Sequence, residues 1–330
     1  SFCTLLMIGF LFDIAWGVFA YAAGIIGIVS CLTYALVQLA QLASKPQNFK
    51  LKYNATWGLV TGASSGIGKC IAERLAAQGV NVVLVALDDD VFAKSFPELQ
   101  SKYPKVQFRK VGVNLGAANE EDYMGPIRQH TDDIDVTLVF NNAGFILPGL
   151  FAESNFGAVR TNFNCNATSA MVITHHFLNR MQAAKKKGLV SFTSSAGAYF
   201  PGPTAAMYSA TKSFLTSFAI SIAGELRDVG IDIVVVHPSP VQSNFYRGTA
   251  DKMTSLQQAQ KAAVSPFVIA DCIFSAAGRL VVWDQGSTCA IFRMVLKTFD
   301  FAFFNEVASR LACHFNPDHK AMAAKSKLRN

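Results

Sequence analysis

Residues 57–78 read WGLVTGASSGIGKCIAERLAAQ, which is a short apolar run, a glycine-rich turn and a segment with helical periodicity. The run at 57–61 predicts a buried strand, and residues 69–78 predict a helix. Glycines let a turn approach phosphates closely, and the free amides of a helix N-terminus add positive potential. The stretch therefore predicts a pyrophosphate site. Its spacing, G-x-x-x-G-x-G, differs from the common G-x-G-x-x-G, so the prediction depends on the strand–turn–helix context.

Outward from this turn, short β-branched runs alternate with longer segments of helical periodicity. The runs lie at residues 57–61, 82–87, 106–113, 136–140, 189–192 and 231–236. Apolar strands that alternate with helices are typical of a parallel sheet covered on both faces. We therefore expect an α/β fold with a doubly wound parallel sheet over residues 56–286, without internal repeats.

The first 44 residues predict a membrane anchor. Asp13 is the only charged residue between positions 5 and 43, and a span needs roughly 20 apolar residues. The stretch therefore allows one long crossing, or two crossings joined near Gly24 and Gly27. Its apolar part is too long for a cleaved signal peptide, and a buried pair of soluble helices is the remaining alternative.

A short basic segment, expected as a linker over residues 45–55, follows the anchor. Lys45, Lys50 and Lys52 lie in it without an acidic residue among them. Basic residues next to a span favour the cytoplasmic side, so we expect the rest of the chain to face the cytosol. The endoplasmic reticulum is the expected membrane, with another organelle membrane as the alternative.

Composition excludes several classes of protein. The chain has 330 residues, of which 51% are hydrophobic and 15% charged, which excludes a disordered chain or a coiled coil. The net charge of +7 suits anionic substrates or a membrane surface, but the bases are scattered, so we expect no nucleic-acid partner. The six histidines show no metal-ligand spacing, so no metal is expected. Seven cysteines without a CxxC motif favour a reducing compartment.

The C-terminal part, residues 287–330, is expected to be an amphipathic helix with a basic tail. Residues 287–315 are rich in phenylalanine but carry scattered charges, which favours a helix at a membrane surface or over a substrate rather than a second span. The end of the chain, residues 320–330, has four bases and no acid. We interpret it as a solvated tail or as a contact for anionic lipid.

The ribose of a bound dinucleotide would meet the end of the second strand, where the chain reads VALDDD at 85–90. An acid here accepts hydrogen bonds from a free 2′-hydroxyl, whereas an arginine accommodates a 2′-phosphate. Leu87 does neither, and Asp88 with its two neighbours repels a phosphate. The local sequence thus favours NAD(H) over NADP(H). The alternative is that residues 88–90 only cap the following helix.

Two further features predict proton chemistry. Tyr208 and Lys212 are four residues apart, which places a phenol and an ammonium on one face of a helix. A nearby ammonium favours the phenolate and lowers the tyrosine pKa, which suits a general acid–base. Ser195 follows an apolar strand, where its hydroxyl can hold a substrate carbonyl oxygen or can cap the strand end.

Together these motifs resemble the short-chain dehydrogenase/reductase family over about residues 56–277. The resemblance rests on the glycine turn, the run NNAG at 141–144, Ser195, and the Tyr208/Lys212 pair. It implies a Rossmann-type sheet and an NAD(P)(H)-dependent oxidoreductase with Tyr208, Lys212, Ser195 and an asparagine as catalytic residues. Asn162, Asn164 and Asn166 are the candidates for that asparagine, and Asn166 fits best. The implied nucleotide contacts are Thr61, Gly62, Ser64, Ser65, Gly66, Ile67, Gly68, Asp88, Asn114, Asn142, Ala143, Gly144, Tyr208, Lys212, Pro238, Ser239, Val241 and Ser243.

The chain departs from the family pattern at three of these positions. Ser239 and Ser243 replace glycine and threonine in the nicotinamide-side loop at 238–243, and Asn114 replaces an aspartate beside the adenine. The N-terminal anchor and the apolar C-terminus are most similar to the membrane-bound 3-ketoacyl-CoA reductase and 17β-hydroxysteroid dehydrogenase type 12 group. That group generally uses NADPH, with an arginine where this chain has Leu87.

The resemblance implies a membrane-anchored oxidoreductase that passes a hydride between NAD(P)(H) and a lipophilic carbonyl or alcohol, such as a 3-ketoacyl-CoA or a steroid. The implied partners are this small molecule and membrane lipid, with a homodimer or a membrane complex left open. The alternative is an accessory or structural subunit of a membrane assembly that retains the fold. The set of Ser195, Tyr208 and Lys212 favours the enzyme, since a scaffold has no need of it.

Overall fold

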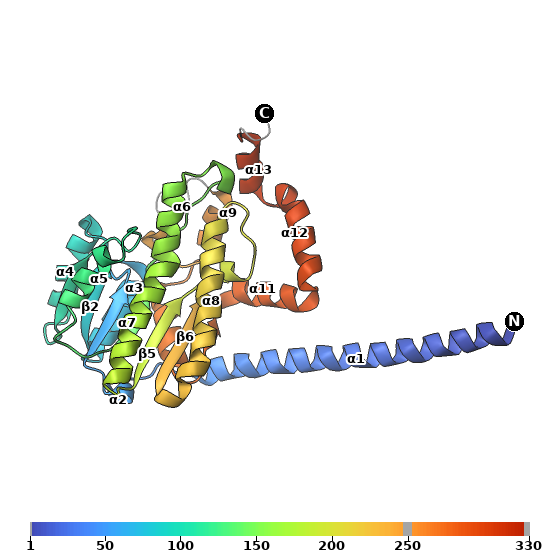
Figure 1. Ribbon diagram of the computed structural model, residues 1–330, viewed down its shortest axis with the longest axis horizontal. Coiled ribbons are helices and arrows are strands. Elements are labelled where there is room, and N and C mark those ends of the chain that lie inside the picture. The colour runs from blue at the N-terminus through green and yellow to red at the C-terminus, as the bar shows by residue number, and fades with distance from the viewer. Residues whose placement is uncertain (1, 247–252, 327–330) are drawn as a thin grey trace. The chain divides into compact units, whose positions relative to one another are not determined.

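The computed structural model describes residues 2–246 and 253–326, and it divides into two compact units, Ser1–Lys45 and Pro46–Asn330 (Figure 1). The first unit is one continuous helix, α1 (Phe2–Ala43), rather than two helices with a turn. At Gly24 and Gly27 a Cβ atom would meet only open space, so neither glycine serves a turn or a close helix contact within the described chain. Phe12–Ala43 is long and apolar enough to cross a membrane by length and composition.

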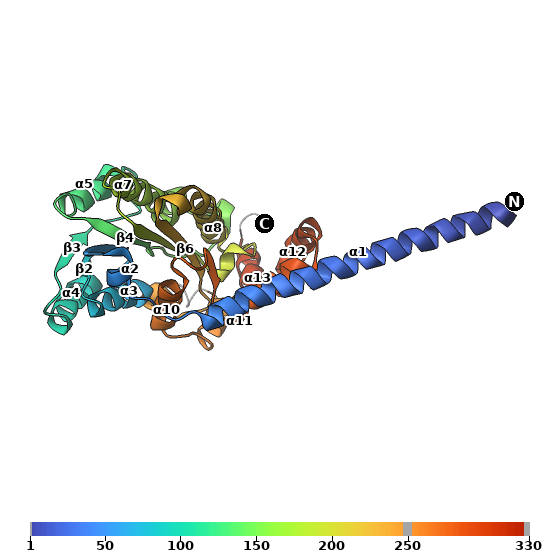
Figure 2. The same cartoon turned by 90° about the horizontal axis from the view of Figure 1, so that it is seen from below.

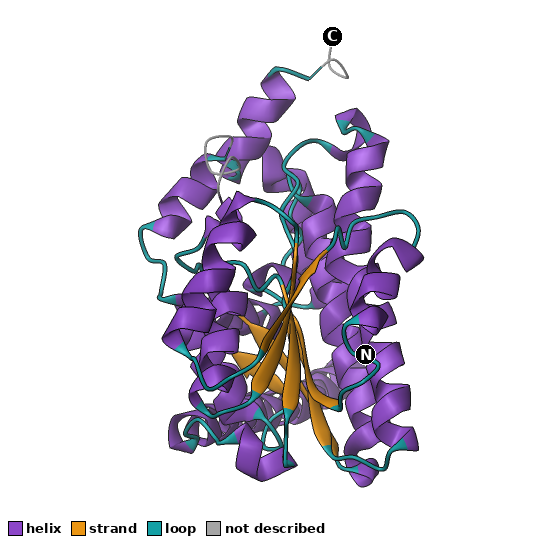
Figure 3. Ribbon diagram, turned by 90° about the vertical axis from the view of Figure 1, so that its left-hand side faces the viewer, coloured by secondary structure: helices purple, strands orange, loops and turns teal. Residues whose placement is uncertain are grey.

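The second unit is built around a parallel sheet, which Figure 3 shows between two layers of helices. In the described residues the sheet has seven strands in the order β3-β2-β1-β4-β5-β6-β7, and every pair is parallel. The strands are β1 (Trp57–Thr61), β2 (Asn81–Ala86), β3 (Phe108–Gly112), β4 (Val136–Asn141), β5 (Gly188–Thr193), β6 (Ile231–His237) and β7 (Val282–Asp284). The chain order reverses between β1 and β4, so the carboxyl ends of these strands form the crevice in which such folds bind ligands.

Helices cover both faces of the sheet, as Figure 2 shows. One face carries α3 (Gly66–Ala77), α4 (Asp90–Lys102) and α10 (Pro266–Ala276). The other carries α5 (Glu121–Gln129), α7 (Ser169–Ala183) and α8 (Ala206–Leu226). Strands β1 and β4 are buried along their whole length because each contributes side chains to a separate apolar core on each face. The predicted doubly wound α/β fold is confirmed.

The segment expected as a linker is part of this folded unit. Residues 49–53 form helix α2 (Phe49–Tyr53), and the Phe49 side chain is fully buried. Its ring stacks on that of Phe274 at a centroid distance of 4.1 Å, with Phe140 beside it. The linker prediction is therefore wrong for these residues. A single buried phenylalanine in a short polar segment produces no hydrophobic periodicity in the sequence.

The C-terminal part is broken into three helices rather than one. They are α11 (Gly286–Thr298), α12 (Phe301–Phe315) and α13 (Pro317–Ala324). Asp300 begins α12 by accepting a hydrogen bond from the Phe303 amide, and Asn316 with Pro317 begins α13. Residues 327–330 of the predicted basic tail lie outside the described residues.

Short elements complete the chain between these helices. They are α6 (Phe156–Phe163), α9 (Thr254–Gln260), the π-helix η2 (Asn164–Thr168), and the 3₁₀ turns η1 (Phe151–Glu153), η3 (Ala196–Ala198), η4 (Arg227–Val229) and η5 (Asn244–Tyr246).

Candidate active site

A cleft of about 660 Å³ lies at the carboxyl ends of β1, β4, β5 and β6. Most of the predicted site residues line it, which brings together the four motifs from distant parts of the chain. The predicted residues in its wall are Gly62, Ser64, Ser65, Gly66, Ile67, Asn142, Ala143, Gly144, Ser195, Tyr208, Lys212, Pro238, Ser239, Val241 and Ser243.

The glycine turn has the form that a dinucleotide pyrophosphate requires. Gly62 and Gly66 have φ of +65° and +55°, which side-chain-bearing residues rarely adopt. At Gly68 a Cβ atom would collide with the Gly62 carbonyl. Ser65 precedes the first turn of α3 without a side-chain cap, so the amides of that turn are available to an anion at the cleft. These residues fit a nicotinamide dinucleotide.

Thr61 lies behind the cleft wall and joins two of the motifs. Its hydroxyl accepts hydrogen bonds from the amides of Asn142 and Ala143, at 2.9 and 3.0 Å. The Asn142 side chain in turn donates to the Thr61 carbonyl at 3.2 Å. The turn after β1 and the turn after β4 are therefore held at a fixed separation.

Tyr208 and Lys212 lie one turn apart on α8, as predicted. The Lys212 ammonium is 5.7 Å from the centre of the Tyr208 ring and donates to the Thr193 carbonyl at 2.7 Å. Burial lowers the pKa of Lys212 to about 8. A buried cation beside the phenol stabilises a phenolate, which is the arrangement that a tyrosine acid–base needs.

Ser195 begins the turn η3 directly after β5. Its hydroxyl accepts a hydrogen bond from the Gly197 amide at 3.1 Å, so the strand-end capping role is real. A Cβ atom on Gly197 would lie 3.5 Å from both the Ser195 hydroxyl and the Tyr208 ring. The two side chains therefore meet at the same wall of the cleft, where one carbonyl oxygen could contact both.

Asn166 is fully buried in the π-helix η2, an irregularity common at functional sites. Its side chain exchanges two hydrogen bonds of 2.9 Å with the backbone of Phe145 and donates to Thr211 on α8 at 3.3 Å. Asn162 also reaches Phe145, whereas Asn164 donates to the Ala117 carbonyl. Asn166 is thus the candidate that connects the turn after β4 to the helix of Tyr208.

The loop after β6 accommodates both of its departures from the family pattern. The Ser239 hydroxyl donates to the Gln285 carbonyl at 2.6 Å. A Cβ atom on the neighbouring Gly286 would lie 2.5 Å from the Ser239 hydroxyl oxygen. Ser243 lies against the glycine turn, since a Cβ atom on Gly66 would be 2.9 Å from the Ser243 Cβ. This loop therefore covers the phosphate end of the cleft.

The predicted ribose and adenine residues are placed differently from the others. Leu87 and Asp89 line the cleft, but the Asp88 carboxylate forms an ion pair with Lys110 on β3 instead. Asp89 caps α4 by accepting from the Phe92 amide at 2.9 Å, which is the alternative left open from the sequence. Asn114 is exposed and accepts from the Gly116 amide at 2.9 Å.

The far end of the cleft is apolar, and the sequence indicated this only through the helix expected over a substrate in residues 287–315. Its wall includes Ile146, Phe245, Leu256 and Phe292. The Phe245 ring lies 5.7 Å from that of Tyr208, so the apolar surface begins beside the candidate acid–base. The only signal for it was the high phenylalanine content of residues 287–315, to which Phe292 belongs.

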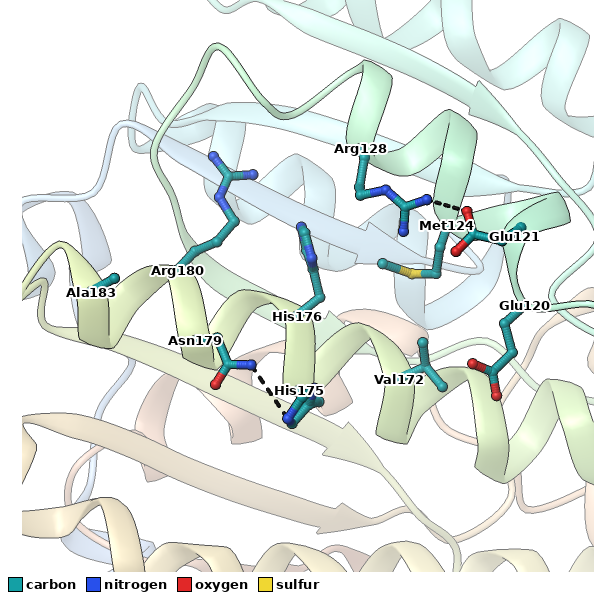
Figure 4. Close-up of a pocket in the computed structure, with 10 residues that line it drawn as sticks. All are labelled: Glu120, Glu121, Met124, Arg128, Val172, His175, His176, Asn179, Arg180 and Ala183. Carbon is teal, nitrogen blue, oxygen red and sulfur yellow. Dashed lines mark hydrogen bonds and ion pairs between the residues drawn. The ribbon is translucent and has the colours of Figure 1, made fainter.

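A second hollow, of about 440 Å³, lies between α5 and α7 (Figure 4). Arg128 forms an ion pair with Glu121 in its wall, and Asn179 contacts His175. None of the predicted site residues lies in its wall. The cleft at the strand ends is therefore the candidate active site.

The comparison with known families agrees with this geometry. The model of the short chain dehydrogenase family matches residues 56–254. The chain belongs to this family. Like its relatives, it is an NAD(P)-dependent oxidoreductase that acts on CH–OH and C=O groups.

Two of the similar curated proteins are a hydroxysteroid dehydrogenase and a 3-oxoacyl-CoA reductase. A 17-beta-hydroxysteroid dehydrogenase type 3 from Mus musculus is 29% identical over 248 residues, which cover 73% of this chain and 77% of that protein. A very-long-chain 3-oxoacyl-CoA reductase from Meyerozyma guilliermondii is 32% identical over 231 residues, covering 66% of this chain and 67% of that protein.

Solved short chain dehydrogenase structures show the same fold. The structure of a 7beta-hydroxysteroid dehydrogenase has a TM-score of 0.64 at 20% identity and covers 84% of this chain and 99% of that one. A short-chain dehydrogenase from Sphingobium yanoikuyae in complex with NADPH has a TM-score of 0.63 at 20% identity, covering 76% and 94%.

Proposed function

We propose that this chain is a membrane-anchored reductase of a lipophilic carbonyl, or a dehydrogenase of the matching alcohol. The observation that carries the proposal is the placement of Ser195, Tyr208 and Lys212 where the cleft changes from polar to apolar. A polar end that holds a nucleotide and an apolar end that holds a lipid tail suit this reaction class. An accessory subunit has no need for a lysine buried in this way.

Each reacting group has a separate role in the proposed reaction. A bound nicotinamide supplies or accepts the hydride. In the direction of reduction, Tyr208 gives its proton to the carbonyl oxygen, which the Ser195 hydroxyl holds by a hydrogen bond. The Lys212 ammonium stabilises the phenolate that remains, and Asn166 fixes the helix turn between Tyr208 and Lys212 through Thr211. In the direction of oxidation the same groups act in reverse.

The substrate class follows from the apolar end of the cleft and from the relatives. Ile146, Phe245, Leu256 and Phe292 offer contacts to an acyl chain or a steroid, but no charged partner for a small polar substrate. The relatives are named for 3-oxoacyl-CoA and hydroxysteroid substrates. We therefore propose a long-chain 3-oxoacyl-CoA as the first substrate to test and a steroid ketone as the second.

We propose NAD(H) as the preferred nucleotide. Leu87 is 55% exposed, lines the cleft and offers no cation to a 2′-phosphate. The Asp89 carboxylate adds negative potential at the same end. Lys110 is the nearby base from outside the loop, and its ammonium is paired with Asp88.

Helix α1 is the proposed anchor, with the second unit on the cytosolic side of the endoplasmic reticulum. The proposal rests on the apolar span Phe12–Ala43 and on the basic residues that follow it. Helix α11, which lines the cleft with Thr288 and Phe292, is the proposed cover of the substrate.

The test is a reduction assay with the full chain in detergent. NADH and NADPH are each offered with 3-oxohexadecanoyl-CoA and with a steroid ketone, and nucleotide oxidation is followed together with the alcohol product. We expect turnover with at least one of these ketones and none without it. A chain that binds nucleotide but reduces neither ketone would contradict the proposed substrate class.

A further inference from the structure

A buried carboxylate at the end of β7, Asp284, lies outside the predicted catalytic set. The Tyr199 hydroxyl donates to its Oδ1 at 2.7 Å, and the Arg293 guanidinium donates to its Oδ2 at 2.7 Å. The His237 Nδ1 lies 3.0 Å from the same Oδ1. The Asp284 side chain is 5% exposed and that of His237 0%. A carboxylate withdrawn from water this far is stable only because such partners surround it.

The partners of Asp284 belong to two segments that form the substrate side of the cleft. Tyr199 follows Ser195 by way of the turn η3, whereas Arg293 is on α11, which lines the cleft with Phe292. An apolar contact joins the same two segments, since the ring centroids of Phe200 and Phe292 lie 4.3 Å apart, with the ring planes tilted by 31°. Asp284 is the polar connection between them.

His237 extends the network to the helix of the acid–base. Its Nε2 lies 2.9 Å from the Thr216 hydroxyl, which donates to the Lys212 carbonyl at 2.9 Å. Asp284 therefore contacts, directly or through one side chain, the Ser195 segment, α11 and α8.

The charge of Asp284 is fixed by the same contacts. Burial alone would raise the pKa of its carboxyl, but the hydrogen bonds from His237, Tyr199 and Arg293 outweigh burial and hold the pKa below its usual value. The group is therefore an anion at neutral pH, and its hydrogen bonds are charge-assisted.

We propose that Asp284 is a positioning residue, which holds the segment after Ser195 and helix α11 together across the substrate side of the cleft. The inference rests on the proposed function. The hydrogen bonds of Asp284 to Arg293 and to Tyr199, called here the Arg293 arm and the Tyr199 arm, have separate effects. The Arg293 arm holds α11 over the substrate and so acts on substrate binding, whereas the Tyr199 arm holds the Ser195 segment and so acts on turnover.

Amide hydrogen exchange of the full chain in detergent tests the assignment without any substrate. Asp284→Asn should speed exchange roughly tenfold in both residues 195–200 and α11. Tyr199→Phe should do so in residues 195–200 alone, and Arg293→Gln in α11 alone. The matched control is Asp271→Asn, which breaks an ion pair with Arg74 on the opposite face of the sheet and should alter neither segment.

Kinetics with 3-oxohexadecanoyl-CoA separates the two arms. Arg293→Gln should raise KM roughly tenfold with kcat little changed, and Tyr199→Phe should lower kcat roughly tenfold with KM little changed, as for one lost charge-assisted hydrogen bond each. Asp284→Asn should show both effects, and adding Tyr199→Phe to it should lower kcat no further. If Asp284→Asn does not fold, the two single-arm variants carry the test, since Tyr199→Phe removes one hydroxyl only.

The outcomes separate this inference from the proposed function. An inactive wild-type chain contradicts the proposed substrate class, and the exchange pattern then still tests Asp284. An active wild type whose variants show unchanged kinetics, or faster exchange spread evenly over the whole unit, overturns the positioning role.

Discussion

At the scale of single residues, the burial of Lys212 predicts how the free energy of unfolding changes with pH. Its pKa is lowered by burial from 10.5 to about 8, so below pH 8 folding places a charged ammonium in the interior. The unfolded chain binds more protons between these two values, and stability therefore rises with pH across that window. Wild type should gain about 2 kcal/mol of unfolding free energy relative to Lys212→Met between roughly pH 7 and pH 9.5.

Denaturant unfolding of both proteins in detergent at a series of pH values measures this difference. Asp271→Asn, with Lys212 intact, is the control and should follow the wild-type slope. If the difference in free energy of unfolding between wild type and Lys212→Met stays constant over this pH range, the ammonium is not desolvated.

Leu87 carries the prediction on nucleotide preference. NADH should bind at least as tightly as NADPH, because a 2′-phosphate without a basic partner costs about 1–3 kcal/mol, or roughly 5–150-fold in affinity. Leu87→Arg should shift the ratio of the two dissociation constants toward NADPH by a factor in that range. Fluorescence titration with both nucleotides at one ionic strength measures the ratio. A wild-type preference for NADPH that Lys110→Ala abolishes would identify Lys110 as the missing base.

At the scale of elements, helix α2 lies at the beginning of the second unit. Deleting residues 1–44 removes only α1, so the remaining chain should leave the membrane as a folded, nucleotide-binding protein. Gln47 donates to the Ala277 carbonyl at 2.7 Å, so the unit needs its first residues. Flotation after a high-salt wash checks the release. Retention through the wash would make α11 and α12 an apolar anchor, and retention lost with salt would indicate the basic tail.

Phe49 is the matched test of the same boundary. Its ring fills a place between Phe140 and Phe274, and Phe49→Ala leaves a cavity there. We expect a loss of about 3–5 kcal/mol in the free energy of unfolding. Leu51→Ala, in the same helix but 80% exposed, should change it by less than about 0.5 kcal/mol. If Phe49→Ala and Leu51→Ala lower the free energy of unfolding by equally small amounts, residues 49–53 act only as a linker.

The features that the sequence predicts are those that a local pattern records, whereas contacts between distant segments leave no such pattern. Six strands are long enough to show as apolar runs, whereas β7 has three residues and shows no pattern of its own. Tyr208 and Lys212 are neighbours on one helix, so their pairing is visible in the sequence. The burial of Phe49, the pairing of Asp88 with Lys110 and the network of Asp284 each depend on residues from other segments, and no local pattern records them.

At the scale of the whole molecule, the fold places the nucleotide, the proton donor and the apolar wall around one cleft. The role of the proton donor can be tested by removing a single oxygen atom. Tyr208→Phe removes a hydroxyl and leaves the ring that packs against Phe245. The nucleotide site should therefore remain intact while proton transfer is lost.

The decisive measurement is the rate of 3-oxohexadecanoyl-CoA reduction by Tyr208→Phe beside its dissociation constant for the nucleotide that supports wild-type turnover. We predict a loss of roughly 100-fold or more in kcat, the range for a lost general acid, with a dissociation constant within about threefold of wild type. Turnover close to the wild-type rate in a variant that binds nucleotide normally would contradict the role of Tyr208 as the general acid.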